Sequence, residues 1–358
     1  MRKLPWKVVE TGTEMIKTST RTALAAVLIA LSAISSSAHA LVININPGTT
    51  LAANSSALAA FNQAANQWSL QIADPITVVV DADMAPLGNG IIGQTSSVTL
   101  RGPYNTIRNA MVADSASETD DGVVAAMPTA EQFSAFMPTG FGLSGRLSAT
   151  KANLKALGFA GLDTAFGVTD ATIIFGTSFP FDFDASNGVG TGLIDFETVA
   201  AHEIGHALGF VSIVDTIDTL LANGQTAEVA PRTLDLFRFG AELAPSNLAD
   251  FTTAARNLVP GHAAIFDDLD SELAFSTGAF NGGGRHASHW KDTGLNGTRV
   301  GTMEPTLASG TFVPVGSNDL RALDLIGYDI AATPVPTALY LFASGLLGFV
   351  GVTRKKAA

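Results

Sequence analysis

The chain lacks cysteine altogether and is poor in basic residues over most of its length. Without cysteine it can form no disulfide and can offer no thiolate to a metal ion. A bound zinc ion would therefore have to be held by histidine and carboxylate side chains. With 358 residues, the chain is long enough for one large domain or two ordinary ones.

The scarcity of basic residues is sharpest in the middle of the chain. Of the 20 lysines and arginines, five lie in residues 1–40 and three in residues 354–356, whereas only two of the 32 acidic residues lie in those segments. The body between them has 12 basic and 30 acidic residues, a net charge of −18. Such a surface repels nucleic acid and anionic lipid. It suits a soluble extracellular protein, and it could also collect calcium.

Residues 1–40 have the pattern of an export signal. Five basic residues precede an apolar run at 23–34, and Ala38-His39-Ala40 is a small-x-small cleavage site. We therefore expect a signal peptide at 1–40 and a mature chain that begins at Leu41. An uncleaved N-terminal membrane anchor is the alternative, and the shortness of the apolar run argues against it.

Residues 198–210, TVAAHEIGHALGF, contain the motif H-E-x-x-H. We expect a helix over about 196–210, on which His202 and His206 share one face because residues four apart lie one turn above each other. Both imidazoles can then reach one zinc ion, and the Glu203 carboxylate can meet a water molecule bound there. The flanking residues are largely apolar, so the helix is expected to be buried, where ionisable groups need partners.

A catalytic zinc normally has three protein ligands, and the third is not adjacent here. The motif His202-Glu203-x-x-His206-x-x-Gly209 resembles that of the metzincin proteases. Most of these proteins place a third histidine three residues after the glycine, but the residue here is Ser212, a poor zinc ligand. Asp215, three positions further on, is not at the usual spacing.

Two downstream segments, ASHWK at 287–291 and GTMEP at 301–305, resemble the leishmanolysin branch of the metzincins. The resemblance implies that His289 is the third ligand and that Met303 is the Met-turn residue, which packs beneath the zinc histidines. An ordinary core methionine is the alternative for Met303. His286 competes with His289 as a ligand. The chain departs from the leishmanolysin pattern in lacking cysteines, and it has no glycine-rich calcium repeats of the serralysin type.

The C-terminal residues 334–358 form a second targeting feature. Residues 339–352 are almost wholly apolar and are followed by Arg354, Lys355 and Lys356. From Val335 the sequence resembles the PEP-CTERM sorting tail of Gram-negative bacteria, with Val335-Pro336 where many members have Pro-Glu-Pro. The resemblance implies an exosortase-type processing enzyme, membrane association through the tail before processing, and a final location at the cell surface or outside the cell. A plain C-terminal anchor is the alternative.

We expect an α+β fold for residues 41–333: a metzincin-like catalytic domain with a mixed twisted sheet, an active-site helix and a C-terminal helical subdomain. Residues 211–284 are expected to be an insertion-like segment. Periodicity and turn residues predict strands at 41–46, 76–80, 96–100, 171–175 and 272–275, and helices at 52–70, 103–112, 148–157, 246–258 and 319–328. Ser246 is the expected N-cap of the helix at 246–258. Residues 114–145 are expected to be irregular.

Several finer features stay open at this point. Asp182, Asp184, Ser186 and Asn187 with Gly188 form a candidate calcium loop, although the glycine falls one place late for an EF-hand and a solvated turn is the favoured interpretation. The strand at 171–175 is expected to line the cleft and to pair with a peptide. Tyr104, Tyr328 and the backbone around Ile173 are the candidate oxyanion donors.

These residues together predict a secreted or surface-displayed zinc metalloendopeptidase. Its substrate is expected to be a protein or peptide, its cofactor Zn²⁺, and its general base Glu203. A surface or matrix binding protein with a non-catalytic zinc site is the main alternative. Glu203 argues against it because a purely structural site has no use for a general base. A metal-dependent hydrolase of non-peptide substrates is the second alternative.

Overall fold

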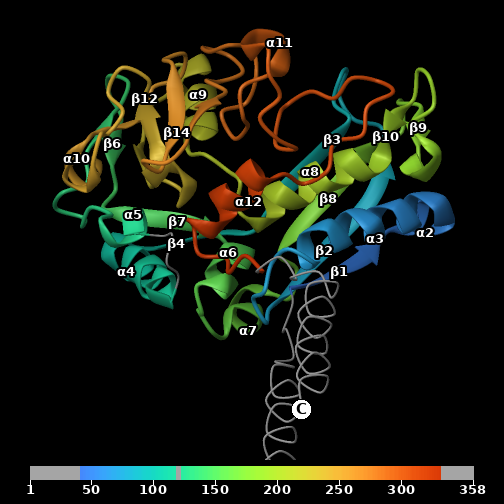
Figure 1. Ribbon diagram of the computed structural model, residues 1–358, viewed down its shortest axis with the longest axis horizontal. Helices are drawn as coiled ribbons and strands as arrows, with labels where there is room; N and C mark the ends of the chain where they lie inside the picture. Colours follow the sequence, from blue (N-terminus) through green and yellow to red (C-terminus); the bar gives the residue numbers. More distant parts are fainter. Residues whose placement is uncertain (1–40, 118–121, 332–358) are drawn as a thin grey trace, which may run out of the picture. The chain divides into compact units, whose positions relative to one another are not determined.

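The computed structural model describes residues 41–117 and 122–331 (Figure 1). The expected signal peptide at 1–40 and the expected sorting tail at 334–358 lie outside these described residues. Within the described ranges, no helix is both long enough and apolar enough to cross a membrane.

The first half of the described chain forms a mixed four-stranded sheet in the order β1-β2-β8-β3. β1 (Val42–Pro47), β2 (Thr77–Ala85) and β8 (Ala171–Gly176) are parallel, and β3 (Gly93–Ser97) runs antiparallel to β8. Buried and partly exposed residues alternate along β2, as a strand with one face on the core requires. β3 has no further partner in this sheet, so one of its edges is free of sheet pairing.

Two long helices cross one face of this sheet (Figure 1). α3 (Ser55–Ser69) packs against α8 (Phe196–Leu208), and Trp68 Nε1 donates to the carbonyl of Ala201 at 2.9 Å. The predicted single helix at 52–70 is two helices, because Asn54 accepts from Ala57 N at 3.1 Å and caps α3. The residues before it form the short α2 (Thr49–Ala53).

The chain changes sheets at Val98, which explains why two predictions are only partly right. Val98 N donates to Asp170 O at 2.8 Å, and Val98 O accepts from Lys151 N at 2.7 Å. The predicted strand 96–100 is therefore the junction of β3 with β4 (Thr99–Pro103). The first residues of the predicted helix 148–157 belong to β7 (Arg146–Thr150), since pairing with β4 draws them into a strand before α6 (Lys151–Ala156) begins.

The region between these strands contains short elements rather than the irregular chain expected at 114–145. They are α4 (Tyr104–Asp114), η1 (Ser115–Ser117), α5 (Gly122–Ala125), β5 (Ala135–Phe136) and β6 (Gly142–Leu143). After α6 come α7 (Leu162–Phe166), β9 (Phe181–Asp182), η2 (Ala185–Asn187) and β10 (Ile194–Asp195), which leads directly into α8.

The region after α8 differs from the expected C-terminal helical subdomain because strands form much of it. It supplies four strands of a five-stranded sheet in the order β15-β14-β12-β13-β5: β15 (Glu272–Phe275), β14 (Ala264–Asp267), β12 (Arg238–Gly240) and β13 (Arg256–Asn257). Because β5 precedes α8 in the chain, this sheet ties the segment 211–284 to the first half. The remaining elements are α9 (Val214–Ala222), β11 (Glu228–Val229), η3 (Leu234–Phe237), α10 (Leu248–Thr253), α11 (Thr293–Asn296) and α12 (Ser317–Asp324).

The helix predicted at 246–258 is the shorter α10, and its N-cap is Asn247 rather than Ser246. Asn247 Oδ1 accepts from Ala249 N and Asp250 N, at 3.0 and 3.1 Å, whereas Ser246 Oγ donates to the Asp250 carboxylate. The strand predicted at 272–275 coincides with β15. Helices and mixed sheets thus confirm the α+β class.

Buried arginines bind main-chain carbonyls in the second sheet. Arg256 is fully buried, and its Nε and Nη1 donate to Leu236 O and Phe251 O, each at 2.8 Å. Arg238 Nη2 donates to Ser276 O at 2.7 Å. These guanidinium groups tie separate segments together in a chain that has no disulfide to do so.

Candidate metal centre

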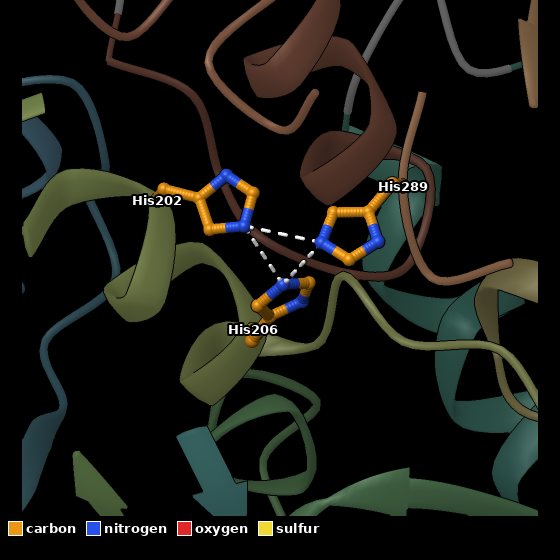
Figure 2. Close-up of side chains that lie close together, drawn as sticks. All are labelled: His202, His206 and His289. Carbon is orange, nitrogen blue, oxygen red and sulfur yellow. Dashed lines mark hydrogen bonds between the residues drawn. The ribbon is translucent and has the colours of Figure 1, made fainter. Parts of the chain in front are cut away.

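Three imidazole rings meet at one point, two from α8 and one from the loop that precedes α11 (Figure 2). The Nε2 atoms of His202 and His206 lie 3.1 Å apart, and each lies 3.2 Å from Nε2 of His289. Among the residues that the structure describes, these three form the only cluster of histidine and acidic groups arranged to hold a metal ion. The structure therefore brings together the three histidines that the sequence singled out.

The other ring nitrogen of each histidine fixes the tautomer. Nδ1 of His202 lies 2.8 Å from Thr302 O, Nδ1 of His206 lies 2.7 Å from Phe210 O, and Nδ1 of His289 lies 3.0 Å from His286 O. A carbonyl oxygen can only accept, so each Nδ1 must carry the proton. In the neutral rings, all three Nε2 atoms then present lone pairs to one another. Although they lie at hydrogen-bond distance, they have no proton to share.

Such a convergence of lone pairs fits a cation at its centre. Three nitrogen ligands about 2.0–2.1 Å from a tetrahedral zinc ion lie about 3.3 Å from one another, close to the separations observed. Burial lowers the pKa of His202 to about 4, and burial with mutual repulsion holds the pKa values of His206 and His289 well below the ordinary range. The rings are therefore neutral near pH 7, which is the form that binds metals.

Local sequence positions the first two histidines. Asp195 Oδ2 accepts from Thr198 N at 2.7 Å and caps the N-terminus of α8. The helix ends at Leu208. The C-cap Gly209 follows with a φ of 136°, which suits glycine and turns the chain so that Phe210 O reaches His206. The two histidines, the N-cap Asp195 and the C-cap Gly209 thus all lie within one short stretch of chain.

Long-range contacts position His289, and Asp215 on α9 binds the two residues that come directly before it. Its carboxylate accepts from Ala287 N at 2.5 Å, from Ser288 N at 3.0 Å and from the Ser288 hydroxyl. Ser288 Oγ in turn accepts from Ser212 N at 2.8 Å. Asp215 thus lies outside the histidine cluster and holds the backbone immediately before His289.

Asp319 on α12 holds the far side of the same loop. This fully buried carboxylate accepts from Trp290 Nε1 at 2.8 Å, from Thr302 N at 2.8 Å, from Met303 N at 3.2 Å and from Gly316 N at 3.0 Å. The Trp290 ring also stacks on Phe275, with ring centroids 5.1 Å apart. One carboxylate therefore connects α12 with the residues that follow His289 and with the turn that carries Met303.

Met303 is completely buried, and its side chain packs against α8 at Gly205, one residue before His206. A methyl group at Gly205 would overlap the Met303 sulfur, and it would also contact the Trp68 ring. Glycine at this position lets the methionine approach the helix beneath the two histidines.

Glu203 lies in the same cleft as the three histidines and is 5 % exposed. Thr95 Oγ1 on β3 lies 2.6 Å from Glu203 Oε2 and orients the carboxyl group. A side chain at Gly93 would collide with Glu203 Oε1, so the glycine leaves room for that oxygen. Burial raises the Glu203 pKa to about 7, and the bond from Thr95 opposes this shift.

The cleft has a volume of about 670 Å³. Its lining includes the histidine cluster, Glu203, β3 residues, and residues of the 284–289 and 302–307 segments. The strand beside the cleft is β3, the edge strand, and not the strand predicted at 171–175. That segment is β8, which pairs on both sides and has no free edge.

None of the three expected oxyanion donors reaches the cleft. Tyr104 is buried beside Phe133, with ring centroids 5.2 Å apart. Tyr328 is fully buried, and its hydroxyl donates to Leu208 O at 2.6 Å. Ile173 lies inside the four-stranded sheet, where its backbone pairs with β2 and β3. Side-chain type alone had suggested the two tyrosines, whereas packing turned them into the core.

The remaining candidates also have defined places. His286 lies in the cleft lining but outside the cluster, with its Nδ1 3.3 Å from Asp215 Oδ1, and this contact raises its pKa. In the candidate calcium loop, Asp182 Oδ1 and Oδ2 accept from Asp184 N and Gly190 N, and Asp184 Oδ1 accepts from Ser186 N. Those oxygens thus bind backbone amides of their own turn, in keeping with a solvated turn.

Sequence reasoning missed Thr95, Asp215 and Asp319, each of which acts by contact across the fold. In the sequence, Asp215 stands out only as a candidate ligand at an unusual spacing, and nothing there indicates that it holds the backbone before His289. No comparison, whether with protein-family models, with curated proteins or with solved structures, gives a match.

Proposed function

We propose that this protein is an exported zinc-dependent endopeptidase with a metzincin-like site of the leishmanolysin type. The observation that carries the proposal is the convergence of three neutral imidazole nitrogens beside a buried glutamate in an open cleft. The donor set suits zinc, because three histidine nitrogens leave a tetrahedral ion one open position. His202, His206 and His289 would hold the ion.

The proposed chemistry divides between the ion and the chain. A zinc ion bound there supplies a Lewis acid that acidifies water and polarises a peptide carbonyl. Glu203 accepts the proton from the attacking water at Oε1 and returns it to the amine that leaves. Thr95 keeps the carboxyl group in one orientation through Oε2. The three backbone carbonyls opposite the Nδ1 atoms keep each imidazole in the tautomer that offers Nε2.

The edge strand β3 supports a peptide over other hydrolysable substrates. Its unpaired edge borders the cleft, and Gly93, Gln94, Thr95 and Ser97 line it. An extended peptide can add to such an edge through main-chain hydrogen bonds, which hold the chain without regard to most side chains. The amino-acid sequence of the termini adds the second part of the proposal: export through residues 1–40, and an exosortase-type sorting step at residues 334–358.

The test compares two glutamates of α8. Zinc-loaded wild-type protein, Glu203→Ala and Glu197→Ala are incubated with a mixed peptide library, and the zinc content of each is recorded. Glu197 bonds to Gln67 Nε2 at 2.6 Å and does not line the cleft, so it controls for the loss of a helix carboxylate. We expect Glu203→Ala to retain zinc and to lose cleavage by at least about 100-fold, while Glu197→Ala keeps it.

Equal cleavage by wild type and Glu203→Ala, with zinc bound in both, would rule out the proposed mechanism. Zinc binding without cleavage of any peptide by the wild type would favour a surface or matrix binding protein with a non-catalytic zinc site.

A further inference from the structure

The cleft is less acidic than the body that surrounds it, because its lining contains three acidic residues, Glu203, Asp215 and Glu304, and as many arginines. The body between the two terminal segments has 12 basic residues against 30 acidic ones, yet three of the 12 line this single cleft: Arg232, Arg285 and Arg299. Arg285 Nε lies 2.8 Å from Asp292, and Arg299 Nη1 lies 3.5 Å from Glu304. Within the described residues, Arg232 is the cleft arginine with no carboxylate at ion-pair distance.

The surroundings of Arg232 leave one buried N–H of its guanidinium group without a partner among the described residues. Nη1 donates to Ser148 Oγ at 3.0 Å, and the buried Nε has no hydrogen-bond partner in the described structure. The two nearby carboxylates are engaged elsewhere: Asp235 accepts from Ser212 Oγ and from backbone amides, and Asp215 holds the His289 loop. A buried N–H without a partner is costly, so a ligand acceptor at this point would be favoured.

A second arginine lies beside the first. Arg101 on β4 is the register partner of Ser148 on β7, and Ser148 also forms a bridge with Arg232. Directly paired residues project from the same face of a sheet, so Arg101 and Arg232 flank Ser148 on one face. Arg101 is exposed and has no ion pair among the described residues. Two like charges next to each other repel, and an anion placed between them relieves the repulsion.

We propose that Arg232, assisted by Arg101, forms a subsite that selects peptides carrying an acidic side chain at a set distance from the cleaved bond. This inference rests on the proposed peptidase function and adds its substrate class. A planar guanidinium group suits a carboxylate because it can donate two parallel N–H bonds. In a protein whose body is acidic, the subsite also explains how an acidic peptide is held against general repulsion.

The strand sets the distance from the metal centre. Ser97 Oγ donates to His206 O at 3.0 Å, so the end of β3 adjoins the histidine cluster. From Ser97 to Arg101 the chain advances four residues across the change of sheet at Val98, so the two residues lie at most about 13 Å apart. An extended peptide that leaves the edge of β3 covers this distance in about four residues. Its acidic side chain therefore belongs about two to four residues from the cleaved bond, on the side toward β4.

The experiment uses matched peptides that differ in one glutamate or glutamine, placed at each position from four residues before to four residues after the cleaved bond. Zinc-loaded wild type, Arg232→Gln, Arg101→Gln and the control Arg108→Gln are compared. Arg108 lies outside the cleft lining and donates to Met127 O, so its variant removes the same charge elsewhere. We expect wild type to favour glutamate about tenfold at one position two to four residues away, on one side only.

Arg232→Gln should abolish that preference, Arg101→Gln should reduce it, and Arg108→Gln should retain it. Binding gives a readout that does not depend on turnover: zinc-loaded Glu203→Ala should bind the glutamate peptide about tenfold more tightly than its glutamine twin, and the difference should shrink with salt. Cleavage without any acidic preference, or a preference that survives in Arg232→Gln, would overturn the subsite while leaving the peptidase intact. If the wild type cleaves no peptide, the proposed function fails, and equal binding of the twin peptides then overturns the subsite as well.

Discussion

The two halves of the histidine cluster are built by different means. His202 and His206 come from one helix, where spacing, N-cap and terminator all lie within residues 195–210. His289 comes 83 residues after His206, on a loop that is not part of a helix or strand. Buried carboxylates hold that loop through its backbone amides: Asp215 on one side and Asp319 on the other. A helix carries its own geometry, whereas a ligand on a loop needs support from distant elements.

The largest effect is expected from Asp319→Asn. Four donors point at the two carboxylate oxygens, and an asparagine would turn an NH₂ group toward two of them. Breaking such a buried network should lower the free energy of unfolding by about 4–5 kcal/mol and abolish tight zinc binding. Chemical denaturation and zinc titration measure the two effects. If zinc affinity stays at the wild-type level, the far-side support for His289 is not needed.

Asp74 is a buried carboxylate that accepts few hydrogen bonds, unlike Asp319, so its ionised form should destabilise the fold. Asp74 accepts one amide N–H, from Asp329 at 2.9 Å, and burial with repulsion from Asp329 raises its pKa to about 7. The folded state therefore binds a proton that the unfolded state releases near pH 4. This stabilisation is complete below about pH 4 and is lost as the pH rises to about 7, by no more than about 4 kcal/mol.

The Asp74→Asn variant tests this pH dependence because an amide does not titrate. The free energy of unfolding of this variant should not show the fall between about pH 4 and pH 7 that Asp74 causes in the wild type. At pH 8 the variant should be more stable than the wild type. Denaturation midpoints across that range give the comparison. Parallel pH profiles for the two proteins would show that Asp74 titrates normally in the fold.

Gly205→Ala tests the contact between α8 and the turn that carries Met303. Alanine usually favours a helix by about 1 kcal/mol over glycine, but here the new methyl group meets the buried Met303 sulfur. We expect a net loss of about 2 kcal/mol in the free energy of unfolding. The double variant Gly205→Ala/Met303→Ala should lose less free energy of unfolding than the sum of the losses in the two single variants. A double-mutant cycle measures this difference. Strict additivity would indicate that the two side chains do not compete for space.

The smallest of the four effects is expected from Asp215→Asn, which weakens one side of the loop and leaves α8 intact. Loss of the charged acceptor for two amides and a hydroxyl should lower zinc affinity at least about tenfold. Competition with a chromophoric chelator measures the affinity, and Asp250→Asn on the exposed α10 is a matched control. Wild-type affinity in Asp215→Asn would mean that the loop keeps its place without the aspartate.

Much of the local structure was predictable because its signals lie close together in the chain. The helix α8 and the strand at 272–275 followed from spacing and periodicity, and the mixed α+β class followed from the order of elements. The prediction failed where pairing overrode the local pattern. Residues 148–150 become strand because β4 lies beside them, and the region after α8 supplies four strands of a five-stranded sheet whose individual strands are only two to four residues long.

The sequence by itself determined the pair of histidines and the glutamate, because a helix converts a spacing of four residues into one face. It also pointed to His289 through a resemblance in two short segments. Only the tertiary structure decided that β3 rather than β8 borders the cleft, that Tyr104 and Tyr328 are core residues, and that Asp215 and Asp319 hold the third histidine. These outcomes depend on which segments meet although they lie about 17 to 120 residues apart in the chain, and no local pattern specifies such meetings.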